Sequence, residues 1–519
     1  MVKLPACLPF ARPVRRTLAL LALALVLALN TSCGSSLDAP RAADPDVGEL
    51  VDVPRGAPVD DEDGDLVDLP PAEPEQPIVE PGERLPPSGL GTLGTMRGDP
   101  RFEASGLSTN QRLWYDRTWD ALDASVDEMI STIRRDNSND YARTVFQYHH
   151  ALLLALRASG DLRFLDAVDE TAQAMRAQLR NRWCDGVDRT VWVNQVYGTV
   201  HERDGYLNFR YRRGPDVHYC RDTSDLDAAL VHGHLALVMY AYHVNRDNPS
   251  PKGIDYGERA DFWFDYLRNH FEAKWRERSR TAWPDMDFID IKFCHTYNVF
   301  NLFYWFMGKK LESEGHPDAA AYLRHAQILT DAMFDQPYTP GSRGGGFIDT
   351  VGSYGDAVVY SFGAPRREEG VNDTHLGACP TTYARYTISA VTTLHFEGVA
   401  RWDDTIMTKL ANGMTSFVLD APTITARDDT LAAGVTGSAT VAGIPATTYR
   451  SRLSIGHYTH TTIPTLGIWD ASGRIEAISM QIYEVREPNP ARPSRVFIPA
   501  SMLVVETASD DGLGLTARR

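Results

Sequence analysis

The amino-acid sequence predicts an all-α fold, an (α/α) toroid or incomplete barrel built from antiparallel helical hairpins. Apolar residues recur at helical spacing along most of the chain after residue 105. Several of the expected helices also fall into pairs joined by short turns, as in an array of helical hairpins. Such an array either winds open as a solenoid or closes into a ring. The sequence carries no repeat signature of a known solenoid, so we expect closure.

Residues 1–32 have the pattern of a secretory signal peptide. Basic residues precede an apolar run from Leu18 to Leu29, which is too short to cross the roughly 30 Å hydrocarbon core of a bilayer. The following Ser32-Cys33 resembles the end of the lipobox of bacterial lipoproteins. This resemblance implies a protein that is lipid-anchored at Cys33 in the bacterial outer membrane or periplasm. Ordinary secretion with cleavage nearby is the alternative.

Residues 33–104 are rich in proline, aspartate and glutamate and contain almost no aromatic residues. Such a stretch buries too little apolar surface to offset the entropy lost on ordering, so we expect a lipidated acidic tether. Much of the net charge of −17 lies in this tether and therefore says little about a ligand. An acidic chain also argues against nucleic-acid binding, which requires a basic face. We expect residues 105–519 to form a single catalytic or binding domain.

The helices of this domain follow from apolar spacing and capping signals. The segments 122–133 and 165–179 are apolar on one face, whereas Tyr141 to Ala158 is apolar on most sides and predicts a buried helix between them. Further helices are expected over 224–246, 255–278, 291–313, 317–335, 376–398 and 402–418, and the stretch 456–485 is mixed.

Turns and connections complete the expected architecture. Gly160-Asp161, Gly315-His316-Pro317 and Gly398 to Arg401 separate paired helices. Helices 224–246 and 291–307 are apolar nearly all round, as the inner helices of a toroid would be. The long connections 183–222, 336–373 and 420–448 contain alternating apolar positions, which suggests β-hairpins; decorative loops are the alternative.

The cysteine pattern favours disulfides over a metal site. Without Cys7 and Cys33, four cysteines remain, and two disulfides could form among them in three pairings (Cys184, Cys220, Cys294 and Cys379). No two of these cysteines have the CxxC spacing of a zinc site. We therefore expect no metal and no cofactor.

The segment Phe293 to Asn298 is the densest group of chemically active residues. A helix advances about 100° per residue, so His295 and Asn298 share a face and Tyr297 lies nearly opposite His295. A neutral imidazole beside an amide donor can abstract a proton while the amide holds an anionic oxygen. A hydrogen-bonded core histidine is the alternative.

His295-Thr296-Tyr297, at the start of an aromatic-rich helix, resembles the Asn-His-Ser-Tyr-Trp stretch of the α/α-toroid alginate lyases. The resemblance covers the architecture and this one short motif, and Cys294 stands where the family has asparagine. It implies that His295 neutralises the uronate carboxylate or acts as the base. In that family a later helix supplies an arginine and the catalytic tyrosine.

The segment from Arg366 to His375 occupies the place where this arginine and tyrosine would fall. Arg366 and Arg367 would then bind the carboxylate, and His375 stands where a tyrosine is expected, with Tyr354 as a substitute. Asp373 can fix the tautomer of His375 or cap the following helix. A disulfide between Cys294 and Cys379 would bring His295 and His375 close together.

Two further groups are candidates. Arg212, Arg213 and Tyr219 lie in a locally basic segment, where guanidinium groups can bind carboxylates at two points and tyrosine can stack on sugars. Pairing of these arginines with nearby carboxylates is the alternative. His232 is a candidate base facing the lumen, because Asp225 lies seven residues earlier on the same helical face, whereas His234 points elsewhere.

These residues lead to three hypotheses about function. The first is a monomeric cell-surface or periplasmic lyase that cleaves a uronate polysaccharide, such as alginate, by β-elimination. His295, Asn298 and an arginine would neutralise the carboxylate, His232 or His375 would act as the base, and Tyr297 or Tyr354 as the acid. The alternatives are a toroid glycoside hydrolase with paired carboxylates and a noncatalytic glycan-binding lipoprotein. The sequence contains no GxSxG, P-loop or HExxH motif.

Overall fold

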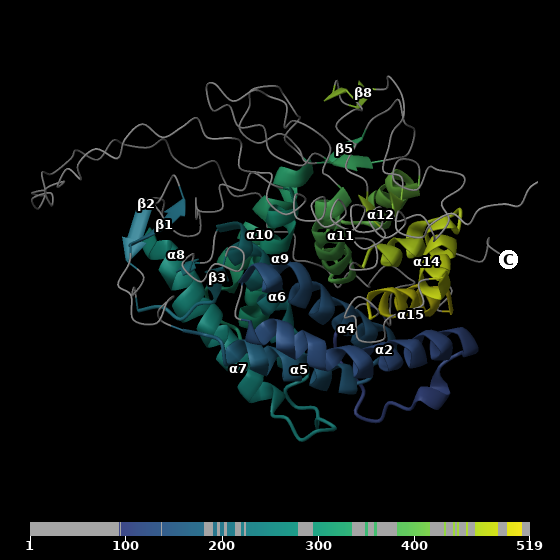
Figure 1. Ribbon diagram of the computed structural model, residues 1–519, viewed down its shortest axis with the longest axis horizontal. Coiled ribbons are helices and arrows are strands. Elements are labelled where there is room, and N and C mark those ends of the chain that lie inside the picture. Colours follow the sequence, from purple (N-terminus) through teal and green to yellow (C-terminus); the bar gives the residue numbers. More distant parts are fainter. Residues whose placement is uncertain are drawn as a thin grey trace, which may run out of the picture. The chain divides into compact units, whose positions relative to one another are not determined.

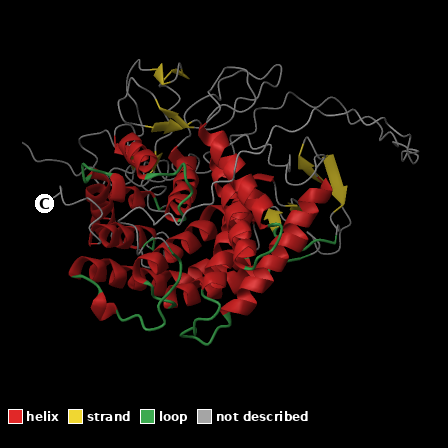
Figure 2. Cartoon of the chain, turned by 180° about the vertical axis from the view of Figure 1, so that it is seen from behind, coloured by secondary structure: helices red, strands yellow, loops and turns green. Residues whose placement is uncertain are grey.

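Helices make up most of the described part of the chain, as an all-α fold requires (Figures 1 and 2). The computed structural model describes residues 93, 95–135, 138–180, 190–194, 198–201, 205–212, 220–222, 225–278, 294–334, 348–350, 358–360, 381–415, 430–431, 440–441, 444–445, 453–454, 462–485 and 496–510. All of them belong to one unit, Pro81–Arg519. Among these residues, none of the helices combines the length and the apolar character that a membrane span requires.

The helices expected between residues 122 and 418 are confirmed, although α11 begins later and α12 ends earlier than expected. In chain order the helices are η1 (Ala104–Gly106), α2 (Thr109–Arg134), α3 (Ser138–Asp140), η2 (Tyr141–Val145), α4 (Phe146–Ser159), α5 (Arg163–Arg176), α6 (Asp225–Val244), α7 (Tyr256–Tyr266), η3 (Leu267–Glu272), α8 (Ala273–Arg278), α9 (Cys294–Ser313), α10 (Ala319–Phe334), α11 (Thr381–Phe396), α12 (Asp404–Gly413), η8 (Ile463–Trp469), α14 (Arg474–Val485) and α15 (Phe497–Asp510). The segments η2 and η3 are π-helical and continue directly into α4 and α8.

Short turns with a glycine in the left-handed region join the paired helices. The glycines expected at three of these turns have positive φ angles: 78° at Gly160, 66° at Gly315 and 76° at Gly398. Gly253, between α6 and α7, and Gly473, before α14, have φ angles of 72° and 67°. Only glycine adopts this backbone conformation without a steric cost, so these positions end one helix sharply and let the next return.

Each pair has one helix that is buried on most sides. The helix α4 is buried from Phe146 to Ala158, which confirms the buried helix expected over Tyr141 to Ala158. In α6 every residue from Ala229 to Met239 is buried. By contrast, α2 alternates buried and exposed positions, as an amphipathic helix on the outside would.

Successive contacts along the buried helices show that they run parallel to one another. Gly233 of α6 lies against Val299 of α9, and seven residues later Tyr240 lies against Phe306, with ring centroids 5.1 Å apart. The same holds for α4 and α11. Phe146 lies near Tyr386, and further along both helices His150 bonds to Thr393. Side chains of α4 therefore reach those of α11.

The C-terminal helix α15 packs against both α4 and α2, and the sequence pattern did not predict it. The Thr507 hydroxyl donates to the carbonyl of Ala158 at 3.4 Å, close to the end of α4. Near the start of α2, Gln111 Nε2 donates to Thr507 Oγ1 at 3.5 Å, and Asn110 Nδ2 donates to Glu506 at 3.3 Å. The end of α15 thus lies beside the end of α4 and the start of α2.

Residues 93–99, here called the N-terminal strap, are bound to the ends of α4 and α6. Asn245 accepts a hydrogen bond from the Gly98 N–H at 2.7 Å and donates to the Met96 carbonyl at 2.8 Å. The Asp99 N–H donates to the Gly160 carbonyl at 2.8 Å. The expectation that the tether extends to residue 104 is therefore wrong at its end. Composition could not show this, because the partners of the strap are tertiary.

Short antiparallel strand pairs occur within the long connections. They are β1 (Thr190–Asn194) with β2 (Gly198–His201), β3 (Arg210–Arg212) with β4 (Cys220–Asp222), β5 (Ile348–Thr350) with β6 (Val358–Tyr360), β8 (Thr440–Val441) with β9 (Ile444–Pro445), and β7 (Thr430–Leu431) with β10 (Leu453–Ser454). In Figure 1 the labelled strands β5 and β8 lie above the helices and β1 and β2 lie at their left, whereas the α6–α7 turn lies at the lower edge.

Candidate functional site

The first turns of α9 hold the segment with the densest sequence signal. Because α9 begins at Cys294, His295, Tyr297 and Asn298 all lie at its N-terminal end. The described side chains of this helix begin at Val299, which contacts the backbone of Gly233 in α6. Residues 294–298 therefore precede this contact along α9.

Most of the other expected site residues lie outside the described residues. These are Cys33, Arg213, Tyr219, Tyr354, Arg366, Arg367, Asp373 and His375. Arg212 is the last residue of β3, where it pairs in register with Cys220 of β4. The approach of His295 to His375 consequently stays a prediction.

His232 is a fully buried core residue, so its position gives no support to the role of a base facing the lumen. Its Nε2 lies 2.8 Å from the hydroxyl of Tyr266, and its ring stacks on Phe271 with centroids 3.9 Å apart. Tyr266 and Phe271 belong to α7 and η3, the outer partners of α6. His232 thus points toward the outer partner of α6 within the same hairpin.

A second group of histidines lies between α4 and α6, and we call His149, His150 and His234 the interior histidine cluster. Their exposed fractions are 0%, 1% and 2%. The His234 ring stacks beside those of His149 and His150, with centroids 5.5 and 6.2 Å away, and Phe146 lies 4.3 Å from it. The cluster therefore joins two parallel buried helices by ring packing.

Hydrogen bonds fix the tautomers of two of these rings. The Thr171 hydroxyl donates to the Val168 carbonyl and so accepts from His149 Nε2 at 2.6 Å. The Thr393 hydroxyl likewise donates to a backbone carbonyl and accepts from His150 Nε2 at 3.0 Å. The Nδ1 atoms of both rings, and both nitrogens of His234, have no hydrogen-bond partner in the described part of the chain. Each Nδ1 of His149 and His150 is therefore an unprotonated lone pair in the interior.

Burial keeps the cluster uncharged. It lowers the pKa of His149 to about 3 and that of His150 to about 3, with the charge of Arg157 lowering the second further. The pKa of His234 is lowered well below its usual value, first by burial and then by the two neighbouring histidines. The rings can exchange neutral hydrogen bonds but carry no charge near neutral pH.

A hydrogen-bonded chain of polar side chains extends the cluster across the interior. The Ser389 hydroxyl of α11 donates to Gln147 Oε1 of α4 at 3.1 Å and lies 2.6 Å from the Thr462 hydroxyl, just before η8. All three side chains are fully buried. The space between α4 and α11 is therefore filled with imidazole, amide and hydroxyl groups.

Buried carboxylates of α5 bind the α6–α7 turn and the start of α7. Asp166 of α5 accepts hydrogen bonds from the hydroxyls of Tyr256 (2.5 Å) and Ser250 (2.7 Å) and from the Lys252 N–H (3.1 Å). Asp169 of α5 accepts from Arg259 Nε at 2.8 Å. Among the described residues, the buried carboxylates are all engaged in this way, so none is free to act as an acid or base.

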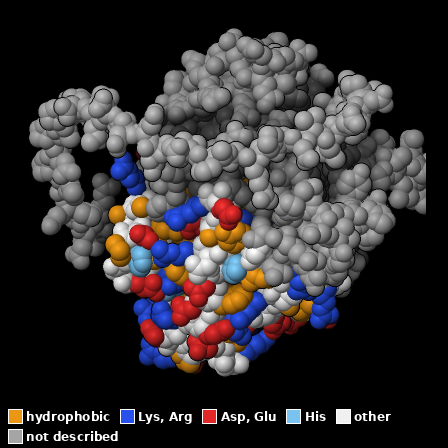
Figure 3. All heavy atoms as spheres, turned by 90° about the vertical axis from the view of Figure 1, so that its left-hand side faces the viewer, with side chains coloured by type: hydrophobic (Ala, Val, Ile, Leu, Met, Phe, Trp, Pro, Cys, Tyr) orange, Lys and Arg blue, Asp and Glu red, His pale blue; other side chains and the backbone are white. Residues whose placement is uncertain are grey.

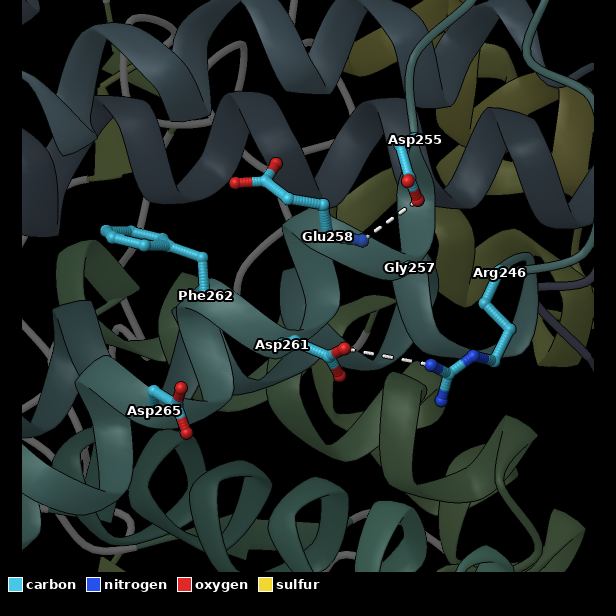
Figure 4. Close-up of a pocket in the computed structure, with 7 residues that line it drawn as sticks. All are labelled: Arg246, Asp255, Gly257, Glu258, Asp261, Phe262 and Asp265. Carbon is cyan, nitrogen blue, oxygen red and sulfur yellow. Dashed lines mark hydrogen bonds and ion pairs between the residues drawn. The ribbon is translucent and has the colours of Figure 1, made fainter.

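A shallow groove of about 490 Å³ lies beside the start of α7 (Figure 4). Its acidic groups have local roles, because Asp255 caps α7 by accepting from the Glu258 N–H at 3.0 Å and Asp261 lies 3.7 Å from Arg246. Acidic and basic side chains are intermixed over the described part of the face in Figure 3. The described residues include no cluster of histidine, cysteine or carboxylate side chains arranged to hold a metal ion.

Sequence reasoning missed His149 and His150. Their only signal is Gln147 to His150, a polar and aromatic run inside an otherwise apolar helix.

Compared with known proteins, the chain matches no family model, no curated protein and no solved structure.

Proposed function

We propose that the paired helices close into an (α/α) toroid. Contacts support a cycle in which each buried element packs against the next: α4 on α6, α6 on α9, α9 on α11, α11 on η8, η8 on α15, and α15 back on α4. The parallel course of α6 with α9 and of α4 with α11 is what a ring of inner helices requires. In this arrangement α2, the first long helix, is the outer partner of α15, the last.

The two ends of such a ring differ. Short glycine turns and the N-terminal strap occupy the end where α4 and α6 finish. The connections that lead into α6, α9, α11 and η8 are long and belong to the other end (177–224, 279–293, 335–380 and 416–462). Long loops held on a rigid helical scaffold are the usual carriers of binding residues. A substrate cleft therefore belongs at the end where α9 begins.

At this end the protein acts as a lyase on a uronate-containing polysaccharide. The observation that carries the proposal is that His295, Tyr297 and Asn298 occupy the first turns of a helix in this cycle. Neutralising the uronate carboxylate, through His295, Asn298 and Arg366 or Arg367, makes the C5 proton acidic enough to be removed.

The elimination then needs a base and an acid. His375 takes the C5 proton, the electron pair forms the C4–C5 double bond, the C4–O bond breaks, and a tyrosine (Tyr297 or Tyr354) gives a proton to the departing oxygen. His232 has no part in this scheme, because it is buried against Tyr266 and Phe271. A hydrolase would instead need two free carboxyl groups, and the buried carboxylates of the described residues are all engaged.

Ultraviolet absorbance of unsaturated uronate ends tests the proposal directly. The purified full chain is incubated with alginate, polyglucuronate and a heparin-like polymer. We expect the absorbance to rise with at least one of them, and His295→Ala to slow the rise by about 10²-fold or more. Reducing ends without new absorbance would indicate a hydrolase, and binding without either product would indicate a noncatalytic glycan-binding protein.

His316→Asn is the matched control for His295→Ala. His316 lies in the turn at the opposite end of the same helix, where its Nδ1 accepts from the Asp318 N–H at 3.1 Å. An asparagine oxygen can accept a similar bond, so this variant should keep full activity. Equal loss in both variants would indicate a general effect on folding and would remove His295 from the mechanism.

The lyase is proposed to reach its polymer from a membrane surface, through a lipid on Cys33. The supporting features are the signal-like residues 1–32 and the Ser32-Cys33 junction. In a bacterial host, the Cys33→Ala variant should leave the detergent phase for the aqueous phase. Unchanged partitioning would contradict the lipid anchor and leave the proposed activity untouched.

A further inference from the structure

The interior histidine cluster lies apart from the proposed elimination and needs its own explanation. His149 and His150 of α4 and His234 of α6 are at least 98% buried, and the rings of His149 and His150 each stack beside that of His234. Such stacking is compatible with neutral rings only, because two imidazolium ions at these distances repel in a medium that screens poorly. The packing of α4 against α6 therefore depends on the three imidazole rings staying neutral.

The described groups that neighbouring elements place against the cluster are uncharged. The group that α5 presents is the Thr171 hydroxyl, α11 presents Thr393 and Tyr386, and α9 presents Val299 against Gly233. Arg157, on the same helix, acts on His150 and forms a buried ion pair with Glu397, just after α11. Arg157 opposes protonation of His150, and the carboxylates of α5 are engaged by the α6–α7 turn and by α7.

The N–H that a further proton would create in the cluster has no hydrogen-bond acceptor among the described residues. Protonation of His149 or His150 places an N–H at Nδ1, which faces no hydrogen-bond partner among the described residues. At His234 it would place an N–H on both nitrogens, which likewise have none. Burying an unpaired charged donor is far more costly than burying a neutral ring, so the protonated side chain must move toward water.

We propose that the interior histidine cluster is an acid-operated release, in which protonation of any of the three rings separates α4 from α6 and α11. Above the range in which free histidine titrates, the rings are neutral and the helices stay packed. In acid, the first ring to be protonated becomes a buried cation whose new N–H has no partner among the described residues, so it moves toward water and loosens the junction of α4, α5, α6 and α11. This inference concerns the helical scaffold and goes beyond the proposed lyase activity.

The sign of the pH dependence follows from linkage. The unfolded histidines titrate near their ordinary pKa of about 6.5, whereas the folded rings stay neutral until far lower pH. Stability should therefore be complete above about pH 6.5 and fall steadily below it, because the unfolded chain binds more protons. The loss should stop only where the folded rings themselves titrate, a pKa of about 3 for His149 and His150.

Urea unfolding of the full chain at a series of pH values measures the protons taken up. Between about pH 6 and about pH 5, where carboxylates contribute little, the slope should correspond to about three protons from the cluster. His234→Phe should lower this uptake by about one, and His234→Leu covers the case in which the larger ring does not fit. His316→Asn, in the surface turn after α9, is the control for replacing a histidine outside the cluster.

An NMR titration of the unmodified chain gives an independent measurement. The ring signals of His149, His150 and His234 should keep their neutral shifts down to about pH 5, while those of exposed histidines move. The inference is overturned if all histidine signals titrate together near the ordinary value. It is also overturned if His234→Phe or His234→Leu folds with the same proton uptake as the original chain.

Discussion

Arg157 is a charged residue inside the apolar helix α4, and the contacts around it explain how that is tolerated. Its guanidinium forms an ion pair with Glu397, and Nη1 donates to the Leu93 carbonyl of the N-terminal strap at 3.1 Å. Only 2% of the Arg157 side chain and 8% of the Glu397 side chain are exposed. One buried cation thus joins α4, the end of α11 and the strap.

Replacing one partner of this buried pair should be costly. Arg157→Met keeps the length of the side chain but leaves Glu397 buried and unpaired, so we expect a loss of about 3–5 kcal/mol in the free energy of unfolding. The double variant Arg157→Met with Glu397→Leu removes both charges and should recover most of that loss. Urea unfolding measures both values. Equal destabilisation by the single and double variants would mean that the pair is not coupled.

Sequence reasoning found candidate site residues where a local pattern carried the signal, and it missed those that depend on tertiary packing. The segment 293–298 stands out by itself, and the structure places His295 at the start of α9 as expected. The helical pattern correctly separated the face of His232 from that of His234. It could not show that Tyr266 and Phe271 would pack against His232. His149 and His234 are 85 residues apart, and no spacing rule brings them together.

Helices were easier to predict than their arrangement, because periodicity and turn glycines are local. The expected helix over 291–313 is α9 (Cys294–Ser313), and the expected helix over 317–335 is α10 (Ala319–Phe334). The failure is α15, in which Pro499 interrupts an apolar run that could equally form a strand. Proline is tolerated there because it lies in the first turn of the helix.

The close approach of α6 and α9 depends on a single missing side chain. A Cβ at position 233 would clash with the Val299 carbonyl oxygen and would lie 2.8 Å from its carbonyl carbon. Both atoms belong to the backbone of α9, so no rotamer change can relieve the contact. Gly233→Ala must therefore push the two helices apart.

We expect Gly233→Ala to lower the free energy of unfolding by about 1–3 kcal/mol, even though alanine favours helix formation by about 1 kcal/mol. Gly106→Ala is the matched control, because a Cβ there meets nothing within 4 Å. Thermal unfolding followed by circular dichroism separates the two. An unchanged melting temperature for Gly233→Ala would show that α6 and α9 do not pack this closely.

Closure of the whole array could not be derived from sequence, since an open solenoid and a ring use the same hairpins. What distinguishes them is whether the first and last helices meet. The contacts of Asn110 with Glu506 and of Gln111 with Thr507, which join α2 to α15, are the reason that we propose a ring. The strap, which precedes α2, contacts the end of α4 through Arg157 and Gly160. The two ends of the described chain are therefore both beside the end of α4.

A circular permutant tests this closure. Joining Asp510 to Leu93 through a short flexible linker, and opening the chain between Gly315 and His316, turns α15 and α2 into one more hairpin. Gly315 lies in a turn where a Cβ would meet nothing within 4 Å, so new ends there disturb no packing. The reference is residues 93–510 in their original order. If the ring is closed, the permutant should have the same far-ultraviolet circular dichroism as this reference. Its unfolding should be cooperative, with a free energy of unfolding within about 2 kcal/mol of the reference value. In an open solenoid the short linker would have to span the array, so the permutant would lose α15 and α2 from the fold and expose the apolar side of α4.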